Sequence, residues 1–576
     1  MLRQARESGS RFPAHGTTIV ASILVLLVSF VGCRPGPFVS YVEIVESTKN
    51  DDYVPLPVVF VPGIKGTELI QQRPDTGPKK LWGLSGHVAF FRGFDELALN
   101  YETVTDGDAQ RFATYYRDRH IYPAEILISY GLGLQWFTFL HAAVYKEMND
   151  LLTREGGFRA AKGPRGRSLF FLPYDWRLDN RIAAVKLAAG LPAFRQEYDS
   201  FLRFWRCERV LKKAECSAQD VERPDVQAEF SQYIARAAKK RPELFRPQGS
   251  ARPEIRFNLV AHSMGGLVAQ YFIAQLGGDD DVHRFITFGT PSRGAMDSLK
   301  AFSEGEYPET LWLNILGAGF YPKRATNYIT MSFPSVYQLL PRYPRAVSGA
   351  LTAESLGLAG SPSAIAEPAQ EERIWQAYKD YQLLPDLEAV GAALGRKPPR
   401  LEETVLRKHL QAQLRSAACF HEAMDGVVDP ICEEEKRKAD AVTFLEGAYR
   451  DRSDERVSAG ALKELRTRLA SSRREKSTRF GGRVVYGGHC HDTIARVRFI
   501  DDKKIEFLGS SVVVGAENGS AAIHVGDGRV PVDSASFRRP NEDWRSSFFL
   551  CESHLGLVKN DSFKYNLLRV LLSDFD

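Results

Sequence analysis

The sequence has little excess charge of either sign, with a formal net charge of +5 over 576 residues, and its basic residues form no concentrated stripe. Nucleic-acid binding normally requires such a stripe, so this function is not indicated. No internal repeat is apparent, so nothing points to a repeat architecture. The apolar run at residues 17–31 is short for a membrane-spanning helix, which needs about 20 apolar residues.

What is present is ordinary for a globular protein. The apolar fraction is 44% and the charged fraction is 26%, both typical of soluble domains. The length suits one large or two ordinary domains with a sizeable hydrophobic core.

The N-terminus carries an export pattern. Arg3, Arg6 and Arg11 precede the apolar run, which meets Gly32-Cys33. A basic segment, an apolar stretch and a small residue describe a secretory signal. Phe30-Val31-Gly32-Cys33 also resembles a bacterial lipobox, whose Cys is lipidated. We therefore expect residues 1–33 to be a lipoprotein signal, with an uncleaved anchor or plain secretion as alternatives, and the body to lie outside the cytoplasm.

Six cysteines remain after Cys33, an even number that permits disulfides in an oxidising compartment. The pairs that are near in sequence, Cys207–Cys216 and Cys419–Cys432, are favoured. His489-Cys490-His491-Asp492 could suggest a metal site, but it lacks a second cluster at ligand spacing. We therefore expect a loop there with a possible disulfide rather than a metal site.

Short apolar strands alternate with helical stretches, which predicts an α/β fold with a mainly parallel sheet. The predicted strands are residues 58–61, 168–172, 256–261, 284–288, 483–486 and 522–525. The predicted helices are residues 142–154, 181–189, 192–204, 225–240, 266–276 and 562–572, and Pro192 fits the first turn of its helix.

Two regions fall outside this alternation. Residues 84–140 are rich in aromatic residues. Residues 345–478 begin with an Ala/Ser/Gly/Pro-rich stretch and continue into charged helices. We interpret residues 345–478 as a helical, partly flexible cap insertion in a catalytic domain made of residues 55–344 and 479–576. A partly disordered surface insertion is the alternative for residues 351–372.

The central motif is Ala261-His262-Ser263-Met264-Gly265, with a strand before it and a helix of small and apolar residues after it. This is the nucleophile elbow of the α/β-hydrolase fold, with Ala in the first glycine position. The sharp turn exposes the serine oxygen, and small residues let the strand and the helix approach closely. Ser263 is therefore the predicted nucleophile, and His262 is expected to fill the elbow rather than act as the base.

The acid and the base should follow the serine in that order. Asp527 lies in a Gly-Asp-Gly turn after the predicted strand 522–525, and His554 lies in a late loop. The His takes the serine proton, and the Asp fixes its tautomer. Asp425 and Asp429 also lie in an acid-like turn, but no good strand precedes it, so Asp527 is favoured. An ordinary turn aspartate is the structural alternative for Asp527.

The oxyanion hole should combine the amide of Met264, just after the nucleophile, with one from the glycine-rich loop after strand 58–61. Ile64 is the predicted second donor, with Lys65 as an alternative. Asp175 and Arg177 follow a buried strand and are expected to form a structural ion pair.

Several motifs together resemble the lecithin:cholesterol acyltransferase family. They are Pro57–Gly63, Pro173-Tyr174-Asp175-Trp176-Arg177, the Ala-His-Ser-Met-Gly-Gly elbow, Phe288–Pro291, Phe333-Pro334-Ser335, Gly526–Pro531 and Ser553-His554-Leu555. They follow the family order and span most of the predicted catalytic domain.

The resemblance implies an α/β-hydrolase fold and a ping-pong reaction, in which Ser263 takes an acyl chain from a phospholipid or other lipid ester. The acyl chain then passes to an alcohol or to water. It also implies a lid within residues 292–327, a membrane-facing surface to which residues 84–140 contribute, and no cofactor. The sequence departs from the family pattern in two ways, both of which bear on substrate entry and acceptor choice. No cysteine lies between Cys33 and Cys207, so the disulfide that closes the family's early loop is missing, and the insertion at residues 345–478 is longer than the family pattern.

Three functions stay open at this point. The first is a lipid O-acyltransferase or a phospholipase-type acyl hydrolase. The second is a plain esterase or lipase that uses water as the acceptor. The third is a lipid-binding lipoprotein without catalysis, for which a broken triad would be expected.

Overall fold

The computed structural model describes residues 48–572, except residues 49, 84–93, 128, 133–139, 144, 248–252, 306–322, 389, 391–400, 428, 450–457, 472–481, 510, 517–518 and 538–543. The export signal with Cys33, five of the twelve aromatic residues in the range 84–140 and the middle of the expected lid lie outside the described residues. Within the described part of the chain, no helix has the length and apolar character that crossing a bilayer requires.

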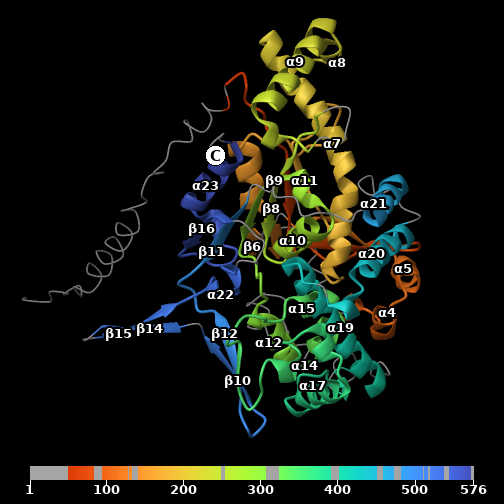
Figure 1. The fold of residues 1–576 in the computed structure, drawn as a ribbon, viewed down its shortest axis with the longest axis vertical. Coiled ribbons are helices and arrows are strands. Elements are labelled where there is room, and N and C mark those ends of the chain that lie inside the picture. Colours follow the sequence, from red (N-terminus) through yellow and green to blue (C-terminus); the bar gives the residue numbers. More distant parts are fainter. Residues whose placement is uncertain are drawn as a thin grey trace, which may run out of the picture.

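The core is a six-stranded sheet of order β16-β11-β9-β8-β1-β7 in which every neighbouring pair is parallel (Figure 1). Its strands are β1 (Val58–Val61), β7 (Leu169–Phe171), β8 (Phe257–His262), β9 (Val282–Phe288), β11 (Arg483–Gly488) and β16 (Trp544–Leu550). All residues of β1, β8, β9 and β11 are buried. Continuous burial explains why most residues of these strands are apolar and do not alternate with polar ones, because helices cover both faces of a parallel sheet.

Five of the six predicted strands are confirmed as members of this sheet, within a few residues. The sixth predicted strand does not belong to this sheet. Residues 522–525 overlap β15 (Gly519–His524), which pairs with β14 (Ser511–Ala516) in a separate antiparallel hairpin. The place at the sheet edge belongs to β16, which the sequence did not reveal. Its sequence, WRSSFFL, has three polar residues after Trp544 and so lacks the continuous apolar run of a central strand.

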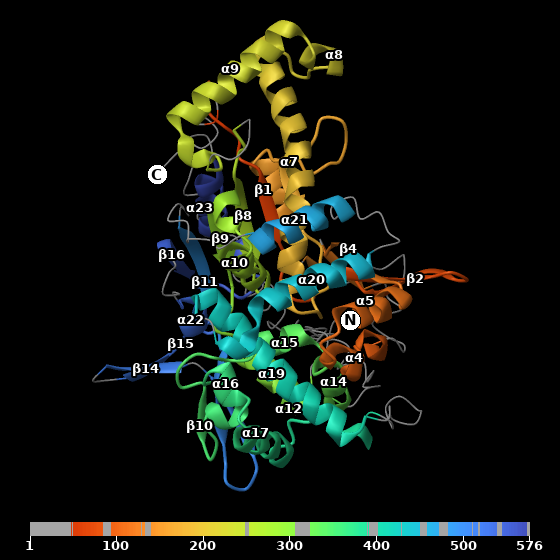
Figure 2. The same cartoon turned by 45° about the vertical axis from the view of Figure 1, so that its right-hand side comes forward.

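Helices flank the sheet on both sides (Figures 1 and 2). On one side lie α7 (Asn180–Leu211) and α10 (Gly265–Gln275), which pack together. On the other side lies α23 (Asp561–Leu572), where Phe563 contacts the rings of Phe288 in β9 and Tyr486 in β11. The elements that continue from α7 are α8 (Ala218–Val221), α9 (Pro224–Lys240) and η3 (Pro242–Leu244), and α10 is followed by α11 (Gly278–Asp281).

Two helix predictions need correction. The predicted helices 181–189 and 192–204 form one continuous helix, α7, with Pro192 inside it. Pro192 is exposed, so the proline costs one backbone hydrogen bond on the solvent side while the buried face of α7 continues. The predicted helix 142–154 begins as strand β6 (Leu140–Ala143), paired with β5 (Ser129–Leu132), and becomes helical only at α6 (Lys146–Asp150) and η2 (Leu151–Glu155). The predicted helices 225–240, 266–276 and 562–572 are confirmed as α9, α10 and α23.

Smaller elements surround the sheet. One antiparallel sheet consists of β2 (Thr67–Arg73), β3 (Gly77–Trp82) and β4 (Ile121–Ile126). A mixed sheet joins β10 (Val347–Gly349), β12 (Ile494–Phe499) and β13 (Ile505–Gly509), with β10 parallel to β12 and β13 antiparallel to it. The remaining elements of residues 55–344 and 479–576 are η1 (Phe94–Leu97), α4 (Tyr101–Thr105), α5 (Ala109–Asp118), α12 (Met296–Glu304), α14 (Lys323–Thr330), α15 (Pro334–Gln338), α22 (Val532–Ala535) and η6 (Leu557–Lys559).

Residues 345–478 contain mainly helices that cross α7 and α15 (Figure 2). They are η4 (Glu354–Leu356), α16 (Pro362–Ile365), α17 (Pro368–Asp380), α19 (Glu403–Asp425), η5 (Pro430–Cys432), α20 (Glu434–Ala448) and α21 (Ala459–Ser471). Residues 351–372, for which disorder was the alternative, lie in η4, α16 and the start of α17 and the turns between them.

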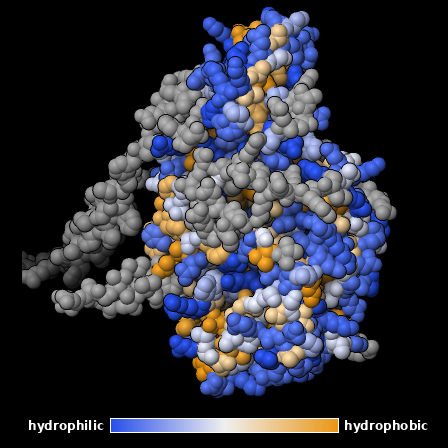
Figure 3. All heavy atoms as spheres, in the orientation of Figure 1, coloured by the Kyte–Doolittle hydropathy of each residue, from blue (hydrophilic) through white to orange (hydrophobic). Residues whose placement is uncertain are grey.

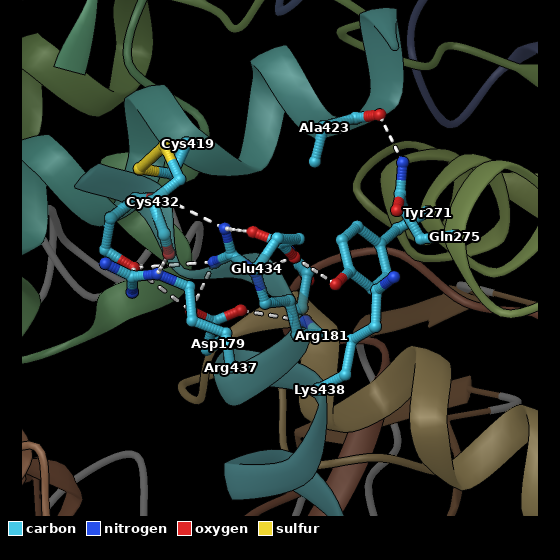
Figure 4. A network of polar contacts seen from close by, with 12 residues as sticks. Asp179, Arg181, Tyr271, Gln275, Cys419, Ala423, Cys432, Glu434, Arg437 and Lys438 are labelled. Atoms are coloured by element: carbon cyan, nitrogen blue, oxygen red, sulfur yellow. Dashed lines mark hydrogen bonds and ion pairs between the residues drawn. A yellow bond between two sulfur atoms is a disulfide. The ribbon is translucent and has the colours of Figure 1, made fainter. Parts of the chain in front are cut away.

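A buried polar network fastens this insertion to the sheet's helices (Figure 4). Arg181 of α7 forms ion pairs with Asp179 and with Glu434 of α20, and Glu434 also accepts a hydrogen bond from the Tyr271 hydroxyl of α10. Burial opposes the charged form of Arg181, but Glu434 and Asp179 outweigh it and raise its pKa above the ordinary value. Removing one member would leave a buried charge without its partner, which is strongly destabilising. The network therefore holds α20 firmly against α7 and α10.

Three disulfides are present among the described residues: Cys207–Cys216, Cys419–Cys432 and Cys490–Cys551. The two predicted pairs are confirmed, and the third joins the loops after β11 and β16. The face of the molecule in Figure 3 is mainly hydrophilic, with apolar residues in small groups, the more prominent ones near the lower left of the body.

Candidate active site

The turn between β8 and α10 has the geometry that the elbow motif predicts. Ser263 has φ +51°, a left-handed conformation that is rare outside glycine. Its backbone N–H donates to Phe288 O at 3.0 Å, which ties the turn to β9. A Cβ at Gly265 would lie 2.4 Å from Pro62 O, so only glycine lets α10 start this close to the loop after β1. The strained turn lifts the serine oxygen off the sheet edge.

Ser263, His554 and Asp527 lie in one chain of hydrogen bonds. His554 Nε2 is 3.0 Å from Ser263 Oγ, and His554 Nδ1 is 2.7 Å from Asp527 Oδ2. Ser263 and Asp527 are buried, with relative exposures of 7% and 2%. Ser263 is 291 positions from His554, and Asp527 is 27 positions from it, yet the three side chains lie in contact. This is the arrangement that a nucleophile, a base and an acid require.

Both oxygens of Asp527 are occupied. Oδ2 faces His554, and Oδ1 accepts the backbone N–H groups of Arg529 at 2.9 Å and Val530 at 2.7 Å. These two donors belong to the Gly-Asp-Gly turn itself, so the turn sets the orientation of the carboxylate. With Asp527 accepting from Nδ1–H, the other nitrogen of His554 is left with a lone pair directed at the serine hydroxyl.

The acid and base loops are positioned by close backbone contacts. The His554 N–H donates to Asp527 O at 2.8 Å, and His491 forms an isolated parallel bridge with Asp527. A Cβ at Gly289, which has φ +58°, would lie 2.9 Å from His554 Nδ1. The Gly289 of the Phe-Gly-Thr-Pro motif therefore gives the imidazole the room that it needs.

The glycine-rich loop after β1 lies directly against the nucleophile. A Cβ at Gly63 would lie 2.7 Å from Ser263 Cβ. The Gly63 N–H donates to the Tyr145 hydroxyl at 2.8 Å, so this amide is already occupied. In the described part of the chain, the backbone N–H groups of Ile64 and Met264 donate to no protein acceptor, as donors reserved for an oxyanion should.

The Pro-Tyr-Asp-Trp-Arg segment holds this loop in place. Tyr174 Oη donates to Pro62 O at 2.8 Å, and Trp176 Nε1 donates to Thr67 O at 3.2 Å. Asp175 and Arg177 form the expected structural ion pair, fully buried and hydrogen-bonded, with a further bond from the Tyr116 hydroxyl to Asp175. The Phe-Pro-Ser motif joins the same cluster, because Ser335 Oγ donates to Trp176 O at 2.6 Å.

His262 lies in the elbow behind the base. Its ring is buried, stacks on Phe288, and has Nδ1 2.8 Å from the Tyr145 hydroxyl. Burial, with a smaller contribution from the neighbouring His554, lowers the pKa of His262 well below its ordinary value. The lowered pKa makes His262 a weak base, and the hydrogen bond of Ser263 Oγ goes to His554 instead, which agrees with the prediction that His262 fills the elbow.

The alternative acids are engaged elsewhere. Asp425, at the end of α19, pairs with Arg293 at 2.7 Å, and Asp429 accepts the backbone N–H groups of Ser363 and Ile431. His489–Asp492 forms a loop closed by the Cys490–Cys551 disulfide, and no group of metal-ligating side chains occurs within the described ranges.

Sequence reasoning missed Tyr145. Its hydroxyl links the loop after β1 to His262, yet it lies far from both in sequence and in no motif. Its sequence neighbours Val144 and Lys146 gave no turn or cap signal that could have singled it out. Only a contact between distant segments identifies it.

Comparison with known proteins bears on the family. Residues 251–376, which contain the elbow and the Phe-Gly-Thr-Pro and Phe-Pro-Ser motifs, match the family model described as lecithin:cholesterol acyltransferase. The chain is related to this family. Together with the six-stranded parallel sheet, the match confirms the predicted α/β-hydrolase fold. It supports a lipid-modifying activity of the acyltransferase or phospholipase type.

The other comparisons add little. No curated protein matches the chain significantly. A solved structure described as "The crystal structure of Tle4-Tli4 complex" is similar with a TM-score of 0.39 and 13% identity, and the similarity covers 90% of this chain and 98% of that one.

Proposed function

We propose that this protein transfers acyl groups from lipid esters through an acyl-enzyme on Ser263. The observation that carries the proposal is the unbroken hydrogen-bond chain from Ser263 Oγ through His554 to Asp527. The lipid substrate class rests on the family match over residues 251–376.

In the first half-reaction, His554 Nε2 takes the hydroxyl proton as Ser263 Oγ attacks the ester carbonyl. Asp527 stabilises the imidazolium that forms and keeps its own negative charge. The same proton then passes to the leaving alcohol, the lysolipid in the case of a phospholipid. An acyl-enzyme remains, in which the fatty acyl chain is esterified to Ser263.

The negative oxygen of the tetrahedral intermediate needs donors close to Ser263. The N–H groups of Ile64 and Met264 supply them in our proposal, because the Gly63 amide is committed to Tyr145. Met264 is the N-cap residue of α10, so the helix dipole places partial positive charge there. One such donor contributes about 3–4 kcal/mol to transition-state stabilisation.

In the second half-reaction, His554 activates the acceptor, an alcohol or water, and the acyl chain leaves Ser263. Transferase and hydrolase differ only in which acceptor reaches the acyl-enzyme first, and exclusion of water favours the alcohol. We also propose that the chain is exported and tethered near Cys33, where it meets membrane lipid. The export pattern of residues 1–33 and the three disulfides support this location.

Covalent labelling tests the nucleophile. A fluorophosphonate probe should label the wild-type protein at Ser263, and Ser263→Ala should remove the label while circular dichroism stays unchanged. A wild type that does not react with the probe would contradict the proposal, and a label elsewhere would move the nucleophile.

A lipid assay tests the acceptor. Purified protein is incubated with phospholipid vesicles that carry a labelled acyl chain, with and without a long-chain alcohol. New labelled ester in the presence of the alcohol supports a transferase. Labelled free fatty acid under both conditions supports a phospholipase instead, and no turnover in either arm contradicts lipid acyl transfer.

A further inference from the structure

The third disulfide, Cys490–Cys551, lies beside the acid–base pair. Cys490 is in the loop after β11, and Cys551 immediately follows β16 and precedes the base by three residues. The bond closes a loop of the chain with a sequence separation of 61, and Asp527 lies within that loop. It therefore connects the segments that carry both the acid and the base.

The neighbours of Cys490 contact both of these segments. The His489 N–H donates to Leu550 O at 2.8 Å, which joins the loop after β11 to the end of β16. The His491 N–H donates to Gly526 O at 3.1 Å, which joins the same loop to the turn of Asp527. Cys490 stands between these two contacts, and its covalent bond to Cys551 fixes the start of the His554 loop against them.

The backbone at this junction is strained. Cys490 has φ +68°, a left-handed conformation that is unfavourable for a non-glycine residue. Such a conformation persists only where the surroundings impose it. Gly488 shows how close the surroundings are, because a Cβ there would lie 2.2 Å from Glu552 O and 2.4 Å from Asp527 Cβ.

Exposure distinguishes this disulfide from the other two. Cys551 is exposed and Cys490 is half-buried, whereas Cys207, Cys216, Cys419 and Cys432 are all buried. A thiol reductant must reach a sulfur atom in order to attack it, so exposed disulfides are the labile ones. Cys490–Cys551 is thus the bond that a thiol can reduce while the protein stays folded.

We propose that the Cys490–Cys551 disulfide is a redox-sensitive clamp on the acid–base pair, so that thiol reduction slows acylation of Ser263. This inference rests on the proposed function. A dithiol attacks one sulfur, the protein S–S bond breaks, and a mixed disulfide forms. The second thiol of the reagent then closes its own disulfide, so two electrons and two protons pass from the reagent to the two cysteines.

The consequence is a compartment-dependent activity. In a reducing cytoplasm the two thiols remain apart and the His554 loop loses its covalent attachment. In an oxidising compartment the bond forms and the base is held on the line between Ser263 and Asp527. A lipid acyl-transfer enzyme built in this way spares the lipids of the cell until it has been exported.

The test measures the rate of fluorophosphonate labelling before and after treatment of the folded wild-type protein with dithiothreitol. Alkylation and mass spectrometry identify which cysteines have been freed. We expect Cys490 and Cys551 to be alkylated first and the labelling rate to fall by about 10²-fold, as displacement of a catalytic group by about 1 Å does. With a soluble short-chain ester, the fall should appear in kcat while KM stays the same.

Two double variants serve as a matched pair. Cys490→Ala with Cys551→Ala should react as slowly as the reduced wild type and should not respond to dithiothreitol. Cys207→Ala with Cys216→Ala removes a buried disulfide, and it should keep the wild-type rate and the full loss on reduction. The reduction experiment on the wild type decides the question even where a variant fails to fold.

The outcomes separate the two proposals. An oxidised protein that never reacts with the probe overturns the proposed function, and this inference with it. An oxidised and a reduced protein that react equally fast, with Cys490 and Cys551 shown to be alkylated, overturn only the clamp. A Cys490–Cys551 bond that stays intact in dithiothreitol, while the fold persists, also overturns it, because the inference requires a reducible bond.

Discussion

Replacing Asp527 with asparagine changes one atom of the acid and should disable the base. In the wild type, Oδ1 accepts two backbone N–H groups and Oδ2 accepts Nδ1–H of His554. Asparagine offers one oxygen and one NH₂ group. If the oxygen keeps the two backbone bonds at 2.9 and 2.7 Å, the NH₂ group faces His554 Nδ1.

That arrangement forces the wrong tautomer on His554. Nδ1 must then accept, the proton moves to Nε2, and Nε2 can no longer take the proton of Ser263. The flipped amide is worse, because its NH₂ group would face two backbone donors. The variant should therefore lose about 10³–10⁴ in kcat, or about 4–5.5 kcal/mol of transition-state stabilisation, while its fold is retained.

The assay is the rate of p-nitrophenyl ester hydrolysis together with the rate of probe labelling. Asp425→Asn is the matched control, since Asp425 is the competing candidate from sequence and pairs with Arg293 rather than with the base. It should leave both rates within about twofold of wild type, because Asp425 pairs with Arg293 and not with His554. A rate for Asp527→Asn within tenfold of wild type would refute the tautomer argument. A large fall in both rates for Asp425→Asn would instead identify Asp425, at the end of α19, as the catalytic acid.

Two further predictions concern buried groups around the site and the insertion. Tyr145→Phe leaves the Gly63 N–H and His262 Nδ1 without their shared partner, so urea unfolding should show a loss of about 2–4 kcal/mol and kcat should fall; an unchanged unfolding midpoint and kcat would contradict the linking role of this hydroxyl. Burial lowers the pKa of His409 from 6.5 to about 4, so its stability contribution is complete above pH 6.5 and is lost as the pH falls toward 4, by about 2 kcal/mol between pH 7 and pH 5. His409→Gln should flatten the corresponding part of the pH dependence of the unfolding free energy, and equal pH dependences in the two proteins would show that His409 does not contribute.

The sequence predicted the central sheet well because its strands are buried on both faces. Segments that are wholly or mostly apolar, such as Val58–Val61 and Phe257–His262, have few other places in a folded chain. Prediction failed at β16 and β15, where periodicity is weak and pairing partners decide the outcome. A short alternating segment fits an edge strand or a hairpin equally well until its neighbours are known.

The predicted helix boundaries were wrong for a related reason. Pro192 signals a helix start by its missing N–H, but α7 runs through it because the proline lies on the exposed side and the opposite face packs against α10. Tertiary packing over many residues outweighs the local cost of about 3 kcal/mol.

The sequence by itself predicted the three residues that the structure brings together in the candidate active site. The elbow around Ser263, the turn around Asp527 and the late His554 are local patterns, because each depends on the backbone conformation of a few consecutive residues. Two of the three disulfides followed in the same way from short spacing. Only the tertiary structure decided which distant groups meet: Tyr145 beneath the glycine-rich loop, Gly289 behind the imidazole, and Cys490 bonded to Cys551 beside the acid and the base. Those contacts join segments that are far apart in the chain, and no local pattern encodes the distance between them.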